Sequence, residues 1–402
     1  MFSHEKIIII RKLSTAIQKY TMIIVLFLVV AFFTVATKNK LLLPQNINNL
    51  IAQNAYVFVL ATGMLLCILT GGNIDLSVGS VLCFVGAIGG KLMQNVVTNG
   101  VTTPGMNFVL AALIMIAIGI VIGAWQAFWI AYVRVPPFIT TLSGMLVFRG
   151  LSNVVLDGKS IRLENQNFIK VFGGGSDCYL LSGDAAKTLC LIVGIAAVVL
   201  FVGFTLLTRI NRKKKQYAVE SLAAYIIKTV LISAVVLFIT FKLRQYKGLP
   251  TVLIWIAIVV GIYTYITSKT TIGRHFYAVG GNEKAAKLSG INTNKVYFLA
   301  YTSMGMLAAL SACLVVARMS ASTTQAGDGY EMDAIGSCFI GGASAYGGIG
   351  TVPGVIIGAL LMGVINMGMS IMGVDMNYQK VVKGLVLLAA VIFDVVSKKK
   401  NS

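Results

Sequence analysis

The chain has 402 residues, of which 57% are hydrophobic and 11% are charged, and its mean hydropathy is +0.87. This composition excludes a soluble domain, because a water-exposed surface of that size needs more charged residues, and it indicates a chain whose solvent is the lipid bilayer. The formal charge of +20 does not indicate a nucleic-acid partner, since the basic residues lie mainly beside the ends of apolar runs, as the positive-inside rule expects.

A basic tail, residues 1–20, precedes the first apolar run. No small-residue cleavage site follows that run before Lys38, so we predict a cytoplasmic tail and a retained first helix instead of a removed signal peptide. Continuous apolar runs indicate membrane helices and not a barrel. The predicted helices cover residues 21–37, 50–70, 76–93, 108–132, 137–151, 188–208, 222–241, 251–267, 296–317, 333–346, 352–372 and 381–396. The prediction is an all-α, polytopic transmembrane bundle of about ten to twelve helices, forming one domain over residues 1–402.

Two segments, one in each half of the chain, share a pattern. Residues 71–80 (GGNIDLSVGS) and 341–350 (GGASAYGGIG) each place a glycine pair at the end of one apolar run, before another run rich in small residues. Such glycine-interrupted pseudo-repeats are typical of transporters, whose pathway lies near the breaks. The candidate pathway residues are Asn73, Asp75, Ser77 and Ser344. Asp75 has an equally good alternative role, because aspartate is a favourable cap for a helix that begins at the next residue.

The middle of the chain contains the loops that set the topology. Residues 152–187 are predicted to be the main outer loop, and the basic cluster at residues 209–215 is predicted to be cytoplasmic. The basic residues at 242–247 then fall on the outer side, against the rule, so residues 210–268 have an alternative placement as amphipathic segments along the inner surface. The cysteines match no metal-site spacing, and only Cys178, paired with Cys190, offers a disulfide.

Residues 269–295 are predicted to be a cytoplasmic loop with a structure of its own. Asn282 is a good N-cap, Glu283 lies in the first turn where the helix dipole favours an acid, and Gly290 can end the helix. The loop therefore contains a helix of about two turns, whose alanines would fit a groove on a partner protein; the alternative is an ordinary connecting helix. The candidate coupling residues are Gly273, Arg274, Gly281, Asn282, Glu283, Ala285, Ala286 and Gly290.

Signatures of chemistry are missing from the sequence. Residues 153–160 end in GKS but begin with Asn153 where a phosphate-binding loop needs glycine, so ATP hydrolysis must occur on another subunit. We expect no enzyme activity, no metal and no cofactor in this chain. Asp328, Glu331 and Asp333 lack an accompanying nucleophile or ligand set, and we interpret them as carboxylates at an outer mouth or a helix start, with a pathway role as the alternative.

Four motifs in order carry a family resemblance: residues 72–80 (GNIDLSVGS), 135–142 (VPPFITTL) followed by Arg149-Gly150, 273–291 (GRHFYAVGGNEKAAKLSGI) and 329–342 (GYEMDAIGSCFIGG). From about residue 46 onward, the chain resembles the ribose, xylose and galactose class of ABC-importer permeases. The additional helices between residues 209 and 267 are similar to the xylose or multiple-monosaccharide branch. Asn73 and the Gly336-Ser337-Cys338 stretch depart from the family pattern and leave the identity of the sugar open.

The resemblance implies a permease of the cell inner membrane that pairs with a second copy, with the sugar pathway at the dimer centre. It also implies an ABC ATP-binding subunit docked on the loop at 281–290, an extracytoplasmic sugar-binding protein and surrounding membrane lipid as partners. Two rival hypotheses stay open: an ABC permease for branched-chain amino acids or nucleosides, and a membrane-embedded enzyme acting on lipid-linked sugars.

Overall fold

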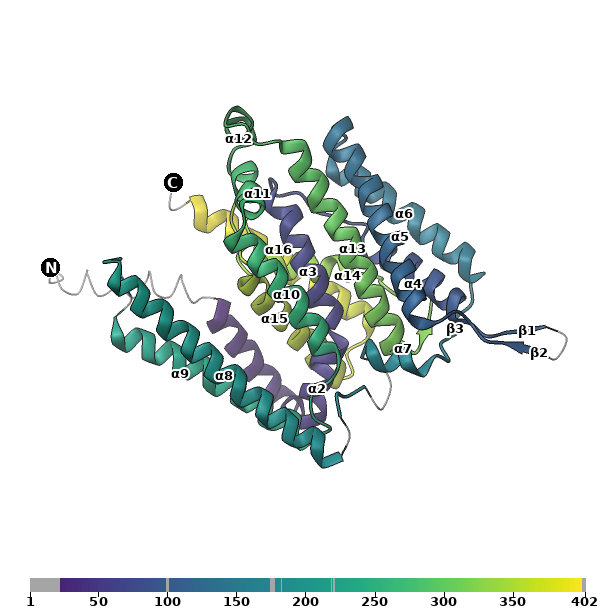
Figure 1. The fold of residues 1–402 in the computed structure, drawn as a ribbon, viewed down its shortest axis with the longest axis horizontal. Helices are drawn as coiled ribbons and strands as arrows, with labels where there is room; N and C mark the ends of the chain where they lie inside the picture. The colour runs from purple at the N-terminus through teal and green to yellow at the C-terminus, as the bar shows by residue number, and fades with distance from the viewer. Residues whose placement is uncertain are drawn as a thin grey trace.

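The computed structural model describes residues 22–399 except 99–100, 174–177, 182, 218 and 220, so the predicted cytoplasmic tail lies outside the described residues. The described chain is predominantly helical, which confirms the all-α prediction (Figure 1). After a first helix, Met22–Ala36, its helices are η1 (Lys40–Leu42), α2 (Pro44–Gln53), α3 (Ala55–Leu69), α4 (Val78–Met93), α5 (Phe108–Phe128), the π-helical turn η2 (Trp129–Val133), α6 (Pro137–Leu156), α7 (Gln166–Val171), α8 (Gly183–Lys214), α9 (Leu222–Gln245), α10 (Val252–Lys269), α11 (Thr271–Gly281), α12 (Glu283–Leu288), α13 (Thr293–Met319), α14 (Tyr330–Ile340), α15 (Val352–Ile371) and α16 (Met376–Lys399). The short strands are β1 (Val96–Thr98), β2 (Val101–Thr103), β3 (Ile161–Arg162) and β4 (Ala321–Ser322), and β1 pairs with β2 and β3 with β4, both antiparallel.

Seven helices of the described part are long and apolar enough to cross a membrane, and the bent pair α2 and α3 adds an eighth span. The expected ten to twelve therefore include helices too short to meet that test alone, such as Met22–Ala36 and α4. The predicted helix at 50–70 is bent by 41° at Asn54. The predicted segment 333–346 is a half-length helix, α14, which ends at Ile340 before the second glycine break.

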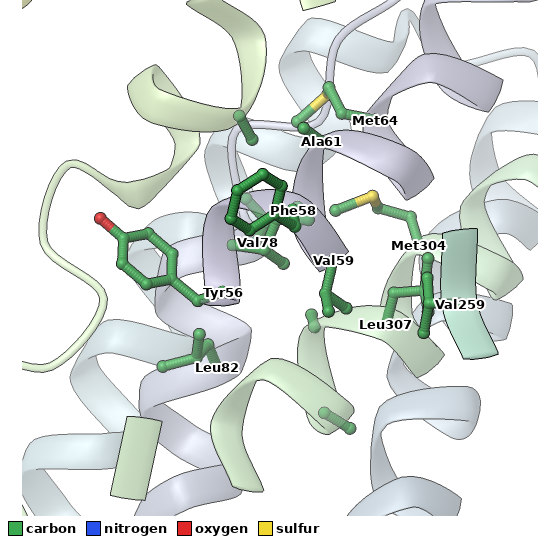
Figure 2. Close-up of a cluster of buried hydrophobic side chains, with 14 of the residues drawn as sticks. Tyr56, Phe58, Val59, Ala61, Met64, Val78, Leu82, Val259, Met304 and Leu307 are labelled. Atoms are coloured by element: carbon green, nitrogen blue, oxygen red, sulfur yellow. The ribbon is translucent and has the colours of Figure 1, made fainter. Parts of the chain in front are cut away.

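The centre of the bundle is α3, which is buried at all 15 of its positions. Figure 2 shows why: side chains of α4, α10 and α13 surround those of α3, including Leu82, Val259 and Met304. A helix that is apolar on every face belongs inside a large bundle, where neighbouring helices satisfy its whole surface. The first glycine break follows the C-terminal end of this central helix, so the break lies where several helices meet.

Glycines bring α5 and α13 into close contact. A Cβ atom on Gly305 of α13 would collide with the carbonyl oxygen of Gly119, and one on Gly123 would lie 2.7 Å from the carbonyl oxygen of Tyr301. The same relation holds between α15 and α14, where Gly358 faces the backbone of Ser337. The GxxxG spacings in these helices therefore serve close helix packing, as small residues commonly do in membranes.

The hairpin of α8 and α9 lies at the side of the bundle (Figure 1). Near its base, Gly194 of α8 packs directly on Thr240 of α9, and α9 in turn contacts α2. Both α9 and α10 are long and apolar enough to span a membrane, which favours crossing helices over the alternative placement along the inner surface. The possible disulfide is wrong: Cys178 and Cys190 are not joined by one, and the Cys190 thiol instead contacts the carbonyl oxygen of Thr240 at 3.5 Å.

Candidate functional site

The predicted two-turn helix is confirmed as α12. The side-chain oxygen of Asn282 accepts a hydrogen bond from the Ala285 N–H at 3.0 Å, and Gly290 ends the turn with a φ of 82°, a left-handed conformation that favours glycine. A second helix, α11, precedes it and was missed in the sequence. Its signal was present, because the Thr270 hydroxyl accepts a hydrogen bond from the Gly273 N–H at 3.1 Å, as a threonine N-cap does.

Glu283 ties α12 to the turn between η2 and α6. Its carboxylate accepts hydrogen bonds from the Arg134 guanidinium at 2.8 Å and from the Tyr297 hydroxyl at 3.1 Å. Arg134 also donates to the Thr293 hydroxyl at 3.1 Å. Partial burial acts to raise the pKa of Glu283, but the hydrogen bonds from Arg134 and Tyr297 and the charge of Arg134 outweigh it and lower that pKa from its ordinary value. Glu283 is therefore ionised at neutral pH and holds α12 in place.

Arg134 reaches this position through an uncommon backbone conformation. It follows the π-helical turn η2, and its own φ is 65°, which costs a non-glycine residue free energy. Val135 and Pro136 come next, and a residue before proline is restricted to extended conformations, so the chain turns sharply before α6 begins at Pro137. The proline motif at 135–142 thus aims Arg134 at α12, a role that the sequence alone did not reveal.

The two faces of α12 differ sharply in exposure. Ala286 is 5% exposed and packs inside the chain, whereas Leu288 is 90% exposed. Ala285 is also exposed. The expectation that both alanines face a partner is therefore wrong for Ala286, because α12 turns that side toward its own bundle. Leu288 is the outward apolar residue that the sequence analysis missed, and its position two residues before Gly290 was the available signal.

Both glycine breaks meet the end of α11 in one junction. A Cβ atom on Gly72 of the first break would collide with the carbonyl oxygen of Ala345 in the second, and one on Gly280 of α11 would collide with the carbonyl oxygen of Leu69. The Gly348 N–H donates to that same Leu69 oxygen at 3.1 Å. We call residues 69–72, 280–281 and 345–348 the glycine junction. Only glycine permits backbones to approach this closely, so the three segments are in direct backbone contact.

A hydroxyl strengthens the link between α11 and the second break. The Tyr277 hydroxyl donates to the carbonyl oxygen of Gly350 at 2.8 Å. Of the other candidate coupling residues, Gly273 packs against the backbone of Ile266 at the end of α10, while Arg274 and Gly281 are exposed. The loop is thus a pair of helices fixed to the bundle at several points, with one exposed surface.

The candidate pathway residues of the first break form a buried polar chain. The Asp75 carboxylate accepts hydrogen bonds from the Ser77 N–H at 2.8 Å and from the Ser77 hydroxyl at 2.6 Å. Gln126 of α5 donates to the Ser77 hydroxyl at 2.9 Å. Asp75, Ser77 and Gln126 are each at most 2% exposed. These bonds hold the turn before α4, which begins at Val78 with Ser77 as its N-cap. The expected capping role of Asp75 is therefore wrong, and Asp75 is closed to solvent in this conformation.

The other two candidates hold the turns of their breaks. Asn73 donates to the carbonyl oxygen of Thr70 at 3.1 Å. Ser344 is 1% exposed, and its hydroxyl accepts a hydrogen bond from the Tyr346 N–H at 3.1 Å. The structure therefore brings the two breaks together, with Asp75, Ser77 and Ser344 buried and Asn73 half-buried.

A polar cavity of about 550 Å³ lies at the end of the bundle opposite α12. The start of α3, the end of α13 and parts of α14, α15 and α16 contribute to it, and Tyr56, Tyr330, Arg318, Asn366 and Lys383 are among its lining residues. The rings of Tyr56 and Tyr330 stack with centroids 3.7 Å apart. Sequence analysis missed this cavity, because its residues come from six helices in two distant parts of the chain: α2 and α3 in one, and α13, α14, α15 and α16 in the other.

A buried ion pair lies beside this cavity. Asp333 is fully buried, its carboxylate lies 2.9 Å from the Lys383 ammonium, and it accepts a hydrogen bond from the Tyr56 hydroxyl at 2.7 Å. Asp328 pairs with Lys380 at 2.7 Å in an exposed position. The carboxylates thus join α14 and the segment before it to α16. Within the residues that the structure describes, no three His, Cys, Asp or Glu side chains gather as ligands for a metal ion.

The chain is similar to known transport proteins over most of its length. Residues 46–391 match the family model described as the permease component of the branched-chain amino acid transport system. The xylose transport system permease protein XylH of Haemophilus influenzae is 38% identical over 387 residues, which cover 96% of this chain and 98% of the relative. XylH of Escherichia coli is 32% identical with 96% and 94% covered, and the ribose import permease protein RbsC of Escherichia coli is 33% identical with 87% and 85% covered. No solved structure matches the chain.

Proposed function

The chain belongs to the permease-component family of the branched-chain amino acid transport system. On that premise we propose that it acts as the non-catalytic, membrane-spanning subunit of an ATP-driven monosaccharide importer. One observation carries the choice of substrate: the similarity to a xylose permease extends over nearly the full length of both chains. A pentose such as xylose or ribose is therefore the proposed cargo. The ATP-binding subunit and the sugar-binding protein of such a system are its partners.

The proposed docking surface for the ATP-binding subunit is the exposed side of α12. Leu288 is 90% exposed, and a large apolar side chain presented on a short helix in the aqueous phase is typical of a helix that fits a partner's groove. Lys284 and Lys287 are exposed beside it and would supply polar contacts at the edge. The nucleotide is bound by the partner, so the permease itself needs no cofactor.

The proposed transmission runs from α12 along two rigid links. The first is the Glu283 to Arg134 contact at 2.8 Å, which connects α12 to the start of α6. The second is α11, which reaches the glycine junction and there contacts both breaks. Because the backbones of the junction touch without intervening side chains, a push on α12 displaces both breaks and the helices that follow them as a unit.

The opposite end of the bundle is the proposed extracytoplasmic side, where the binding protein delivers the sugar near the polar cavity. A second copy of the chain completes the pathway, because a two-fold importer needs two permease halves. Membrane lipid covers the exposed apolar helices, of which α8 and α9 are buried over only 11% and 6% of their spanning windows.

Docking is tested by the variant Leu288→Asp in the full complex, reconstituted in liposomes with its ATP-binding subunit and binding protein. We expect the ATP-binding subunit to stop co-purifying and ATP-dependent uptake of labelled xylose to fall by at least about tenfold, because a buried aspartate has no partner in an apolar groove. Leu181→Asp is the matched control, since Leu181 is also exposed, at 47%, but lies outside α12, in the segment just before α8. Normal co-purification and uptake with Leu288→Asp would refute the docking surface.

The same liposomes test the substrate. Uptake of labelled xylose or ribose that requires ATP supports the proposed function. Uptake of leucine or a nucleoside alone would assign the chain to the transport rival, and product formation from lipid-linked sugar without uptake would assign it to the enzyme rival.

A further inference from the structure

The polar cavity opposite α12 is large enough to hold a small molecule. Its volume of about 550 Å³ lies within the range of roughly 300–1,000 Å³ that small-molecule sites occupy. Amide side chains, a serine hydroxyl and two tyrosine rings line it, and its lining residues, all within the described part of the chain, include no carboxylate. A mixed lining of this kind, with a few convergent polar groups, is typical of a ligand site.

Asn366 of α15 has an acceptor that the protein itself does not use. It lines the cavity, and its side-chain carbonyl oxygen is buried and accepts no hydrogen bond from the residues that the structure describes. Such atoms are uncommon in native proteins and need an explanation, for which a bound molecule is one candidate. A half-turn of the amide exchanges its oxygen and nitrogen, so the acceptor can meet a donor in the cavity.

Two other amides of the lining are held in fixed positions. Asn54 donates to the carbonyl oxygen of Leu50 at 2.8 Å, and Gln379 donates to the carbonyl oxygen of Val374 at 2.9 Å. Their remaining hydrogen-bonding capacity is therefore presented by groups that need little further ordering when a ligand binds.

Arg318 and Lys383 supply donors to the cavity with little net charge. The Lys383 ammonium lies 2.9 Å from the Asp333 carboxylate, which balances its charge and leaves at least one of its three N–H donors for a ligand. Arg318 is half-buried, takes part in none of the ion pairs between described residues, and contacts the side-chain oxygen of Asn49 only at 3.5 Å. Its planar guanidinium can donate to two neighbouring oxygens at once. One unbalanced cation among donors and an acceptor suits a neutral molecule with adjacent hydroxyls.

The tyrosines give the cavity an apolar surface in a fixed place. The Tyr56 hydroxyl donates to Asp333 at 2.7 Å, and the Tyr56 ring stacks on Tyr330 with centroids 3.7 Å apart. Tyr330 is half-buried at the start of α14. A sugar ring has C–H groups as well as hydroxyls, and an aromatic ring offers the apolar contact that those groups need.

Two of the helices that line the cavity lead directly to the glycine breaks. The helix α3 begins at Ala55 beside the cavity and ends at Leu69 in the glycine junction. The helix α14 begins at Tyr330 beside the cavity and ends at Ile340, immediately before the second break. A displacement of the junction would therefore alter the cavity at the far end of the same two helices.

We propose that this cavity is a subsite for a neutral monosaccharide within each copy of the permease, which the sugar occupies after it leaves the binding protein. The proposal rests on the proposed function, which makes this end of the bundle extracytoplasmic. Sugar hydroxyls donate to the Asn366 oxygen and accept from Arg318 and Lys383, while Tyr330 contacts the C–H face. Movement of the glycine junction then changes the site and releases the sugar toward the pathway.

Protection of a thiol tests the subsite in the purified full-length chain. The six native cysteines are buried, so a water-soluble thiol reagent gives little background. Ser370 lines the cavity and is exposed, and the thiol of Ser370→Cys should therefore react. Saturating D-xylose or D-ribose should slow this reaction by about threefold or more, because a bound ligand covers the surface of its site. The L-enantiomers of both sugars should not slow it.

Two further variants locate the effect. Asn366→Leu in the Ser370→Cys background should abolish the protection, because leucine is of similar size but has no acceptor. The matched control is Asn48→Leu in the same background: Asn48 also has a buried side-chain oxygen without a partner among the described residues, but it lies outside the cavity lining, so protection should stay within about twofold. Asn377→Cys, exposed near the start of α16 and outside the lining, should react at the same rate with and without sugar.

The proposal is overturned if neither D-sugar protects Ser370→Cys, if an L-enantiomer protects equally, if Asn377→Cys is protected as well, or if protection survives Asn366→Leu. Stronger protection by D-xylonate, the acid of xylose, would also overturn it, because the site would then select an anion. The comparison of enantiomers decides even if Asn366→Leu does not fold. ATP-dependent uptake by liposomes is measured in parallel: uptake without protection refutes the subsite alone, whereas protection without uptake refutes the proposed transport.

Discussion

The helices α8 and α13 both meet the length and hydropathy expected of membrane spans, yet they occupy opposite environments. The more hydrophobic of the two is the more exposed: α8 has a mean hydropathy of 2.8 and is 11% buried over its spanning window, whereas α13 has a mean hydropathy of 1.8 and is 72% buried. In a bilayer, apolar side chains gain little from being inside the protein, because lipid tails are as apolar as leucine. Hydropathy therefore identifies the spans but not the core.

What separates the two helices is the size of their side chains. The buried surface of α13 carries Gly305, Ala308, Ala309 and Ala312, which let the backbone of α5 approach. The hairpin instead presents large residues such as Leu200 and Phe204, which are 72% and 69% exposed. Close approach of backbones, and not apolar surface, is the feature that distinguishes the inside of this protein from its lipid-facing side.

Matched glycine substitutions give the largest expected contrast. Gly305→Leu should prevent recovery of folded protein, because the new side chain has no space against the backbone of Gly119 and Gly123. Gly203→Leu on α8 should leave thermal unfolding unchanged or raise the free energy of unfolding by about 0.5 kcal/mol, since a Cβ atom at Gly203 meets no atom within 4 Å and leucine favours helix. Size-exclusion profiles after heating in detergent measure both.

Equal tolerance of the two substitutions would contradict the close packing of α5 and α13. A strong loss with Gly203→Leu would show that the hairpin has a protein neighbour on that face, as a second copy of the chain would provide.

Matched leucine truncations give an intermediate effect. Leu60 of α3 is fully buried, and Leu60→Ala should lower the free energy of unfolding by about 3 kcal/mol, because it leaves a cavity in the centre of the bundle. Leu200→Ala should change it by less than about 0.5 kcal/mol, because lipid or detergent fills the space of an exposed side chain. Chemical unfolding in mixed micelles measures the difference. Similar losses at both positions would show that exposure in the monomer does not report contact with lipid.

The smallest expected effect concerns the contact that holds α12. Arg134 and Glu283 are 44% and 37% exposed, so a double-mutant cycle with Arg134→Gln and Glu283→Gln should give a coupling free energy below about 1 kcal/mol at pH 7. The pKa of Glu283 is lowered in the folded protein. Its stabilising contribution is therefore complete above its ordinary pKa of 4.5 and disappears as the pH falls through the lower folded value.

Thermal unfolding of the wild type, the two single variants and the double variant, at pH 7 and in acid, measures this coupling free energy. A coupling of the same size after acidification, or one well above 1 kcal/mol at pH 7, would show that the charge of Glu283 is not what links α12 to α6.

Local sequence signals predicted local structure well. The N-cap at Asn282 and the glycine at 290 placed α12 within a residue of its observed bounds, because capping depends on neighbouring residues alone. The kink at Asn54, the helix α11 and the long extension of α8 to Lys214 were missed. The sequence around Asn54 and at the end of α8 has no glycine or proline that would mark a boundary. The helix α11 was missed although the Thr270 cap and the glycines at 280 and 281 were visible in the sequence.

The candidate site was predicted only in part, because local signals mark the breaks but not the contacts between distant segments. The pathway residues Asn73, Asp75, Ser77 and Ser344 were chosen from the pattern of the breaks, and their role in the pathway stays a prediction. The glycine junction, the Arg134 to Glu283 contact and the pair Asp333 with Lys383 join residues that are far apart in the sequence. Arg134 and Glu283 are 149 positions apart, and Asp333 and Lys383 are 50 positions apart. No local pattern encodes such contacts.

The sequence by itself determined the solvent of this protein, its helical class, its family and the short helix α12, since composition, apolar runs and capping are properties of neighbouring residues. Only the tertiary structure decided which helices form the core, which side of α12 carries Leu288, and where the two glycine breaks meet α11. The physical reason is that lipid and protein interior are equally apolar, so the arrangement of helices depends on backbone approach and on paired polar groups between distant segments.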